Sequence, residues 1–370
     1  MKSFPTMLSE LHRYRSEVTF LVGENGSGKS TNLAMLARQA IDNGRPVLAI
    51  SNTVYDRFPR IRGSYSELAG MFRRNLPGRS LIQAIMARDS DRREKNLHRI
   101  GNVLRYLGFG DDIGISIDAS LRNGLSFHRT RLDEIRPLFD GQPDGIIWLR
   151  GSESGYARSS LNVLHSFQQD GGYPRYKPLP LEFHLRKGGR ILKIGQASSG
   201  ELTLLATYAF IAANIHEGAL LLVDEPENSL HPKWQHEYCT RLLDMFYLYS
   251  PQIIIATHSP LIVSGAQGHK LPIQILEVDG SMLTPRQVTG SIEATLYESF
   301  QTLSPSNHFL SEQVARLLDE LSRGELSKFE FERRIQEFEV SSYDQTQRDF
   351  LSGVRDLGDR VMVGSGKDEV

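Results

Sequence analysis

Eight consecutive residues near the start of the chain have the types and spacing of a phosphate-binding loop. Residues 23–30 are Gly-Glu-Asn-Gly-Ser-Gly-Lys-Ser, which fits the pattern G-x-x-x-x-G-K-[ST]. Glycines at these positions let the backbone wrap a phosphate, with successive N–H groups turned inward where a helix begins. The residues that we expect to bind a nucleotide here are Gly23, Glu24, Asn25, Gly26, Ser27, Gly28, Lys29, Ser30 and Thr31.

Two side chains of this loop would carry its chemistry. Lys29 would reach the β- and γ-phosphates of ATP, and Ser30 would offer its hydroxyl to Mg²⁺. A glycine-rich turn could match the pattern by chance, but the flanks argue against that. Residues 18–22 are mostly β-branched or aromatic and predict a buried strand, and apolar residues recur at helical spacing from Leu33 to Ile41. The motif therefore lies between a strand and a helix, as its chemistry requires.

A pair of carboxylates follows an uninterrupted apolar run, residues 219–223, which predicts a parallel strand covered on both faces. Asp224 ends the run, where it would hold Mg²⁺ directly or through water. Glu225 comes next, where it would polarise the attacking water as a general base. Turns after strands also favour aspartate and proline. Two adjacent carboxylates after five apolar residues nevertheless favour the metal and base roles.

A histidine follows the next apolar run along the chain. Residues 253–256 predict a second buried strand, and His258 comes shortly after it. A lone histidine is more often structural. Open α/β sheets, however, bind ligands at the carboxyl ends of their strands. We therefore expect His258 to donate a hydrogen bond to the γ-phosphate.

A small polar loop feeds directly into a predicted helix at 202–213. Residues 196–201 of this loop are Gln-Ala-Ser-Ser-Gly-Glu. Ser198, Ser199 and Gly200 would stand at the helix N-terminus, which is an anion-binding position. Ordinary loop chemistry would also explain these residues. Their place shortly before the strand that ends in Asp224 favours the phosphate role.

These motifs fall into two separated parts of the chain. Residues 1–54 predict a βαβ unit, and residues 176–300 resume the same nucleotide-binding core. Between them, 55–175 forms a predicted insertion, and 301–370 predicts a helical tail. The remaining elements that the patterns predict are helices at 66–74, 80–107 and 232–247, and strands at 46–50, 113–117, 146–149 and 181–185.

Part of the insertion is strongly basic. Residues 57–107 hold eleven arginines and one lysine against two aspartates and two glutamates, a local charge of +8 in a chain whose net charge is −1. Such asymmetry concentrates positive potential, and the planar arginine fork suits phosphate. We therefore predict contact with nucleic acid through this segment. A solvated helical face, or an interface with an acidic partner protein, would give the same composition.

The composition also bears on the compartment. The chain has one cysteine, Cys239, so it forms neither an intrachain disulfide nor a zinc cluster of cysteines, and a reducing interior is expected. The N-terminal residues have no signal-peptide pattern. No apolar run approaches the roughly 20 residues that span a bilayer. We expect a soluble, cytoplasmic protein with no membrane partner.

Taken in order, these motifs resemble the ATP-binding-cassette (ABC) class of P-loop ATPases. The phosphate loop, the signature loop at 197–201, the acidic strand end at Asp224 and Glu225, the D-loop at 228–231 and the switch histidine occur in that family's order. Residues 224–232, Asp-Glu-Pro-Glu-Asn-Ser-Leu-His-Pro, resemble the soluble RecF-like, SMC-like and OLD-family branch and the ATPase subunits of Septu and retron antiphage systems. The resemblance implies an α/β head with a mostly parallel sheet flanked by helices.

In that family two heads face each other, and each ATP lies between the phosphate loop of one and the signature loop of the other. The resemblance thus implies a homodimer of heads, or a larger even-numbered assembly, in which Ser198 and Gly200 contact the γ-phosphate in trans. The usual signature is Leu-Ser-Gly-Gly-Gln, from which Ala197, Ser199 and Glu201 depart. For the remaining family positions, the candidates are Asn52 or Asp56 for the Q-loop, and Tyr14 with Arg13 for adenine stacking.

The leading hypothesis is a soluble ATPase that closes two heads on ATP and Mg²⁺ and gates a separate effector such as a nuclease, in antiphage defence or DNA maintenance. One alternative is a transporter ATPase subunit, against which the basic insertion and the residues at 227–232 count. Another is an OLD-type ATPase-nuclease, whose acidic metal module would have to fit into the residues after His258. The last is a nucleotide-gated scaffold with negligible turnover.

Overall fold

The computed structural model describes residues 2–3, 17–53, 58, 65–68, 76–86, 89–117, 129–150, 159–164, 166, 181–266, 272–280, 282–286, 308–342 and 345–365. Its largest sheet has eight strands in the order β1-β12-β11-β2-β10-β9-β3-β4. The strands from β11 to β4 are parallel, and β12 and β1 pair antiparallel at one edge. The strand bounds are β1 (Lys2–Ser3), β2 (Glu17–Val22), β3 (Val47–Ser51), β4 (Tyr65–Leu68), β9 (Leu220–Asp224), β10 (Gln252–Ala256), β11 (Ile273–Asp279) and β12 (Met282–Arg286).

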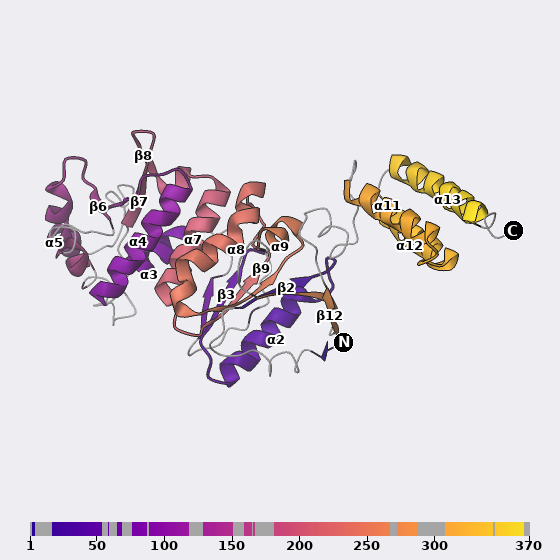
Figure 1. Cartoon of the computed structure of the whole chain (residues 1–370). Coiled ribbons are helices and arrows are strands. Elements are labelled where there is room, and N and C mark those ends of the chain that lie inside the picture. The colour runs from indigo at the N-terminus through magenta and orange to yellow at the C-terminus, as the bar shows by residue number, and fades with distance from the viewer. Residues whose placement is uncertain are drawn as a thin grey trace.

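Helices cover both faces of this sheet (Figure 1). They are α2 (Lys29–Asp42), α7 (Ser199–Asn214), α8 (Pro232–Phe246) and α9 (Pro260–Ala266). In β9, Leu220 and Leu222 cluster with the apolar residues of α2, whereas Leu221 and Val223 cluster with those of α7 and α8. This alternation buries every residue of β9. The mostly parallel α/β fold predicted from the sequence is confirmed.

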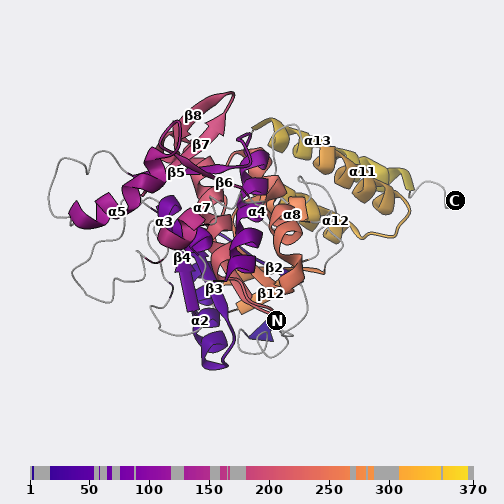
Figure 2. The same ribbon diagram turned by 90° about the vertical axis from the view of Figure 1, so that its left-hand side faces the viewer.

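A second, smaller sheet has four antiparallel strands in the order β6-β5-β7-β8. Its strands are β5 (Ile113–Ile117), β6 (Ile147–Leu149), β7 (Leu181–Lys187) and β8 (Arg190–Lys193), and α5 (Arg129–Asp140) lies between β5 and β6 in sequence. The β7–β8 hairpin turns at Gly188 and Gly189, both with positive φ, and projects next to β5 and β6 (Figure 2). The predicted core segment 176–300 contains β7 and β8, but these strands complete the sheet of the insertion.

Two helices of the insertion pack against α7: α3 (Leu76–Ile85) and α4 (Ser90–Tyr106). The sequence predicts one helix at 80–107, but the structure has two, because Asp89 caps a new helix by accepting from the backbone N–H of Asp91. The helix predicted at 66–74 is wrong at its start. Residues 65–68 form β4, which extends the core sheet beside β3 beyond the predicted boundary at 54.

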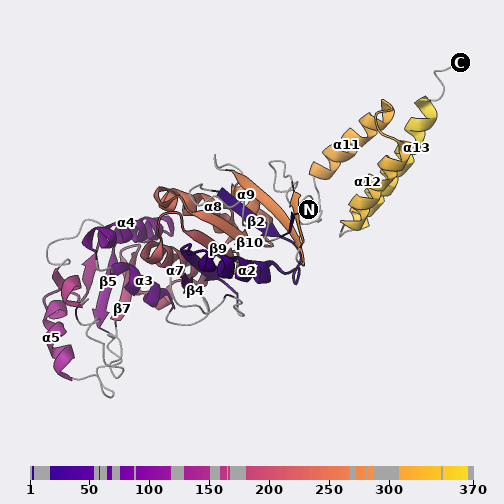
Figure 3. The same cartoon turned by 90° about the horizontal axis from the view of Figure 1, so that it is seen from below.

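The last described elements are helical, as predicted for 301–370. They are α11 (His308–Ser322), α12 (Lys328–Val340) and α13 (Gln345–Ser365). Their buried apolar residues, such as Leu317, Ile335 and Leu351, form a cluster separate from the two clusters of the sheet. In Figures 1 and 3 these three helices pack on one another beyond the core sheet. Two short 3₁₀ helices, η2 (Ile194–Gln196) and η3 (Tyr247–Tyr249), complete the described elements. No helix of the described residues is both long and apolar enough to cross a membrane.

Candidate functional site

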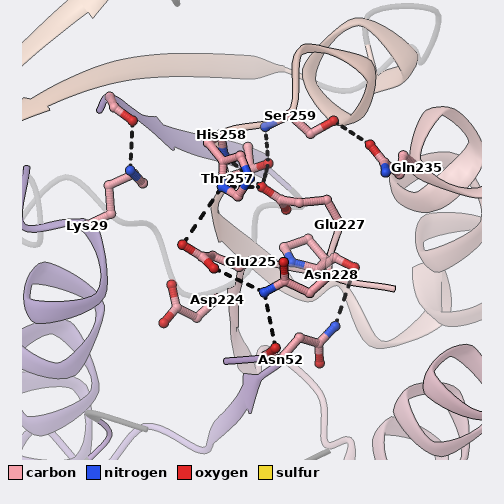
Figure 4. A network of polar contacts seen from close by, with 12 residues as sticks. Lys29, Asn52, Asp224, Glu225, Glu227, Asn228, Gln235, Thr257, His258 and Ser259 are labelled. Atoms are coloured by element: carbon pink, nitrogen blue, oxygen red, sulfur yellow. Dashed lines mark hydrogen bonds and ion pairs between the residues drawn. The ribbon is translucent and has the colours of Figure 1, made fainter. Parts of the chain in front are cut away.

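The candidate site forms where three neighbouring parallel strands end. β10 pairs with β2 on one side and with β9 on the other, so that Ala256 lies beside both Leu21 and Asp224. The carboxyl ends of these strands meet at one edge of the sheet, which is where open α/β sheets bind ligands. The phosphate loop follows β2, the paired carboxylates end β9, and His258 follows β10. Figure 4 shows their side chains converging at this edge.

The phosphate loop has the backbone that its glycines were expected to provide. Gly23, Gly26 and Gly28 have φ values of 147°, 88° and 100°, which favour glycine. A Cβ on Gly23 would also stand 2.9 Å from the carbonyl oxygen of Val278. The loop is tied to the β11–β12 turn, where the Gly280 N–H donates to the Ser27 carbonyl oxygen at 2.9 Å. At the tip Glu24 and Asn25 are exposed, as is Thr31 on α2.

Lys29 lies within this loop. Its Nζ donates to the carbonyl oxygens of Gly23, at 2.7 Å, and of Glu24, at 2.9 Å. The side chain is buried, and burial lowers its pKa against the opposing effect of nearby carboxylates, of which Glu225 is the strongest. The Ser27 hydroxyl is buried without a hydrogen-bond partner. A buried ammonium, an unpartnered hydroxyl and a glycine backbone fit the phosphates of a nucleotide.

The predicted magnesium ligands, Ser30 and Asp224, lie side by side. The Ser30 hydroxyl donates to Asp224 Oδ1 at 3.0 Å across the gap between α2 and β9. Asp224 is buried, and burial raises its pKa to about 6, with Glu225 and Glu227 adding to the rise and Ser30 and Lys29 opposing it. A hydroxyl beside a buried carboxylate is an oxygen donor set that Mg²⁺ prefers. These residues therefore fit the ion.

Replacing Asp224 with asparagine is expected to stabilise the nucleotide-free protein. The folded-state pKa of Asp224, about 6, lies above the ordinary 3.8. The folded protein therefore binds the proton of this carboxyl group more tightly than the unfolded chain does. As the pH rises from 3.8 to about 6, the contribution of Asp224 to the stability of the fold falls. The variant should therefore gain on the order of 2–3 kcal/mol at neutral pH.

Thermal unfolding across this pH range measures the effect of Asp224→Asn. The gain should shrink as the pH falls from about 6 towards 3.8. Added Mg·ATP should stabilise the wild type far more than the variant. A variant that is less stable than the wild type at neutral pH without nucleotide would contradict the prediction.

Glu225 is held at the end of β9 in a conformation that is unusual for glutamate. Its φ is 48°, in the left-handed region, which is uncommon outside glycine and clusters at functional sites. Its N–H donates to the Ala256 carbonyl oxygen at 2.9 Å. Its Oε2 accepts from Asn228 Nδ2 at 3.0 Å, and its Oε1 lies 3.8 Å from His258 Nδ1. The carboxylate is thus oriented by groups from the D-loop and the β10 loop.

Glu227 is a site residue that sequence reasoning missed. Its Oε1 accepts from the Thr257 hydroxyl at 2.8 Å and from the His258 N–H at 2.7 Å, and lies 3.1 Å from His258 Nδ1. Burial raises its pKa. The signal in the sequence was a third carboxylate placed between Pro226 and Asn228, three residues past the strand. Through these contacts Glu227 holds the backbone at Thr257 and His258 in place, and with it the orientation of the imidazole ring.

Asn52, one of the two Q-loop candidates, lies at this site. It follows β3, its side chain is buried, and its N–H donates to the Asp224 carbonyl oxygen at 3.1 Å. Its own carbonyl oxygen accepts from Asn228 Nδ2 at 3.1 Å. The side-chain oxygen of Asn52 is buried without a hydrogen-bond partner. The other proposed residues, Asp56, Tyr14 and Arg13, lie outside the described residues.

The signature residues stand at the N-terminus of α7. Ser198 caps α7, and both Ser198 and Ser199 are exposed. Gly200 is packed so closely that a Cβ would lie 2.6 Å from the Ser229 carbonyl oxygen and 2.9 Å from the Trp234 ring. Gly200 therefore packs against the D-loop and α8, whereas the hydrogen bonds of Ser198 are with Glu201 in the first turn of α7. The two serines are open to solvent, where a second molecule could reach them.

Two described arginines of the basic segment, Arg92 and Arg93, are bound within the protein itself. Arg92 donates to the carbonyl oxygens of Ala213, at 2.8 Å, and Ile215, at 3.2 Å, where α7 ends. Arg93 is buried and donates to Asn162 Oδ1 at 3.0 Å. These two guanidinium groups brace the fold, so they do not serve the predicted phosphate contact. Nucleic-acid binding through 57–107 stays a prediction for the other arginines of the segment, such as the exposed Arg105.

The fold and the site define a P-loop ATPase. The chain belongs to the family described as "AAA domain, putative AbiEii toxin, Type IV TA system", whose model matches residues 18–264. It is 28% identical to the Retron Ec83 probable ATPase of Escherichia coli over 202 residues, which are 50% of this chain and 36% of that protein. It is 31% identical to the Retron Vc95 probable ATPase of Vibrio cholerae serotype O1 biovar El Tor over 110 residues, 27% of this chain and 21% of that protein.

The chain thus spans about a third of the length of the first of these relatives, and less of the second. Among solved structures, it is similar to a dimeric post-hydrolysis state of the ATP-binding cassette MJ0796 bound to ADP and Pi. That similarity has a TM-score of 0.29 at 12% identity, and it covers 74% of this chain and 87% of the other.

Proposed function

We propose that this chain binds Mg·ATP and hydrolyses it between two facing heads, and that closing of the heads gates a separate effector. One observation carries the proposal. The phosphate loop, Asp224, Glu225 and His258 come from three strands and converge at one edge of the sheet (Figure 4). Each type of group that phosphoryl transfer to water needs is present there: a phosphate cradle, metal ligands, a general base and a hydrogen-bond donor.

Each of these residues would have a separate role in the reaction. The loop N–H groups and Lys29 would bind the phosphates, while Ser30 and Asp224 would hold Mg²⁺, which would neutralise charge on the phosphates. Glu225 accepts the proton of the attacking water. His258 donates to the γ-phosphate, and Glu227 keeps the imidazole turned toward it. The direct test is phosphate release from ATP by the purified protein, which should require Mg²⁺ and stop when the metal is chelated.

The second head is proposed from the position of the signature loop. Ser198 and Ser199 are exposed, and the described hydrogen bonds of Ser198 are with Glu201 of the same helix. In the family that the motifs resemble, such a loop meets the γ-phosphate of the facing head. The arrangement therefore supports a homodimer in which each ATP lies between a phosphate loop and a signature loop.

Replacing Ser198 with arginine is expected to block head association at least tenfold while a dilute single head still binds ATP. The large cation would stand where the opposing nucleotide must dock, and the capping hydrogen bonds of Ser198 would be lost as well. Ser90→Arg is a matched control, because Ser90 is an exposed residue at the start of another helix, α4. Light scattering with ATP measures association, and unchanged association in the Ser198 variant would contradict the two-head arrangement.

The effector and the biological role are supported by the relatives. Both curated relatives are named as retron ATPases, and the residues at 224–232 resemble ATPases of antiphage systems. We therefore propose that the heads hold or release an effector, such as a nuclease, when a phage infects. Expression of the chain with its neighbouring genes tests this idea: phage protection should be lost with Lys29→Ala, and protection that is independent of Lys29 would refute ATP gating.

A further inference from the structure

The carboxylate beneath the signature loop binds more donors than helix capping requires. Glu201 lies in the first turn of α7, where its Oε2 accepts from the N–H of Ser198 at 2.7 Å and from the Ser198 hydroxyl at 2.8 Å. Its other oxygen, Oε1, lies 2.8 Å from Lys187 Nζ at the end of β7. A glutamate or a glutamine can form the capping box. The ion pair with Lys187, however, requires the glutamate.

Glu201 carries its negative charge at neutral pH. It is only 9% exposed. Burial acts to raise its pKa, but the hydrogen bonds from Lys187 and Ser198 outweigh burial, and the pKa is lowered. The resembled signature, Leu-Ser-Gly-Gly-Gln, has a neutral glutamine at this position. A fixed charge therefore lies directly under the residues that, in the proposed function, meet the γ-phosphate of the facing head.

That charge would repel the incoming nucleotide unless it is compensated. Like charges at close range in a partly dry interface repel strongly, because solvent screening is weak there. Lys187 supplies the compensation. Its Nζ also lies 4.6 Å from the centre of the Phe109 ring, which fixes the ammonium from the second side. The lysine side chain remains 46% exposed, so its charge lies at the surface, next to the exposed Ser198.

We propose that Lys187 is the counter-charge of the signature loop, a positioning residue that lets Ser198 and Gly200 receive the γ-phosphate of the facing head despite Glu201. The proposal rests on the two-head function proposed above. Its distinguishing consequence is that Lys187 is needed only because residue 201 is a glutamate. Where residue 201 is neutral, the lysine becomes dispensable.

The test compares three variants of the full chain by sedimentation with Mg²⁺ and the slowly hydrolysed analogue ATPγS. Lys187→Met keeps the stem that packs on Phe109 but removes the charge, and should weaken association of the heads at least tenfold. Lys193→Met is the matched control, because Lys193 lies on the same hairpin and pairs with Glu182 at 2.7 Å. It should associate within twofold of the wild type. Dilute protein of either variant should bind a fluorescent ATP analogue within twofold of the wild type.

The decisive variant combines Lys187→Met with Glu201→Gln, which keeps the capping box and removes the carboxylate. It should associate within threefold of the wild type, and Glu201→Gln alone should associate at least as well as the wild type. A Lys187→Met protein that associates normally would overturn the proposal, as would a double variant that stays as weak as Lys187→Met. If Lys187→Met does not fold, the association of the double variant is compared with that of Glu201→Gln alone. Equal association supports the proposal, and tenfold weaker association of the double variant overturns it.

The same data separate this inference from the function on which it rests. If the wild type binds ATPγS but does not associate, the two-head function is wrong and the counter-charge role falls with it. If the wild type associates and Lys187→Met does too, only the counter-charge role is wrong.

Discussion

Replacing Lys29 with alanine is expected to abolish ATP binding, with a loss of affinity of at least a hundredfold. Lys29 is the cation within the phosphate loop, with its Nζ already held among the loop carbonyl oxygens at 2.7 and 2.9 Å. Hydrogen bonds to charged groups contribute about 1.5–3 kcal/mol each, and the lysine makes more than one to a triphosphate. Titration calorimetry with ATP and Mg²⁺ measures the loss.

A matched control for this variant lies on the same helix. Arg38→Ala removes an exposed cation of α2 and should leave the affinity for ATP unchanged. Thermal unfolding without nucleotide should show that the Lys29 variant folds, because the ammonium is partly desolvated and its pKa is lowered by burial. A folded Lys29→Ala protein that binds ATP within twofold of the wild type would contradict the phosphate-loop assignment.

Replacing Glu225 with glutamine is expected to reduce turnover by about 10²–10⁴-fold while ATP and Mg²⁺ still bind. The amide keeps the size of the side chain, and its oxygen can still accept the hydrogen bond that Asn228 Nδ2 donates to Glu225 at 3.0 Å in the wild type. The amide cannot, however, take a proton from water. Because hydrolysis would normally reopen the heads, the variant should accumulate with ATP bound and its heads closed. Single-turnover phosphate release measures the rate.

Glu217→Gln serves as the control for this variant, because Glu217 is an exposed carboxylate just before the opposite end of β9. It should hydrolyse ATP at the wild-type rate. A Glu225→Gln protein with wild-type turnover would rule out Glu225 as the base, and Glu227, whose carboxylate lies 3.1 Å from His258 Nδ1, would then be the next group to test.

The sequence was enough to locate the groups that end the central strands. Asp224 and His258 could be placed together because buried parallel strands have continuous apolar sequences, and the carboxyl ends of such strands meet at one edge of the sheet. Glu227 was missed because its role depends on partners from another strand, Thr257 and His258, which no local pattern reveals. The Lys187–Glu201 pair was missed for the same reason, although Glu201 was noticed as a departure from the usual signature.

Other errors arose where local pattern and tertiary pairing disagree. Residues 65–68 were predicted as helix, but β3 offers them a parallel partner at the sheet edge, and the strand forms. The nucleic-acid contact of 57–107 stays a prediction, but the fold uses two of the arginines on which it was based. Arg92 binds the carbonyl oxygens that end α7, and Arg93 is buried against Asn162. The net charge of a segment does not distinguish guanidinium groups that are bound within the fold from those that are open to a ligand.

The central claim is that ATP joins two heads of this chain. Sedimentation of the Glu225→Gln protein with and without Mg·ATP tests it most directly, because slow hydrolysis lets the closed state accumulate. The account predicts that the mass doubles on addition of Mg·ATP, and that Lys29→Ala in the same background keeps it at that of one chain. A Glu225→Gln protein that binds one ATP per chain, as calorimetry would show, and yet keeps the same mass would contradict the account.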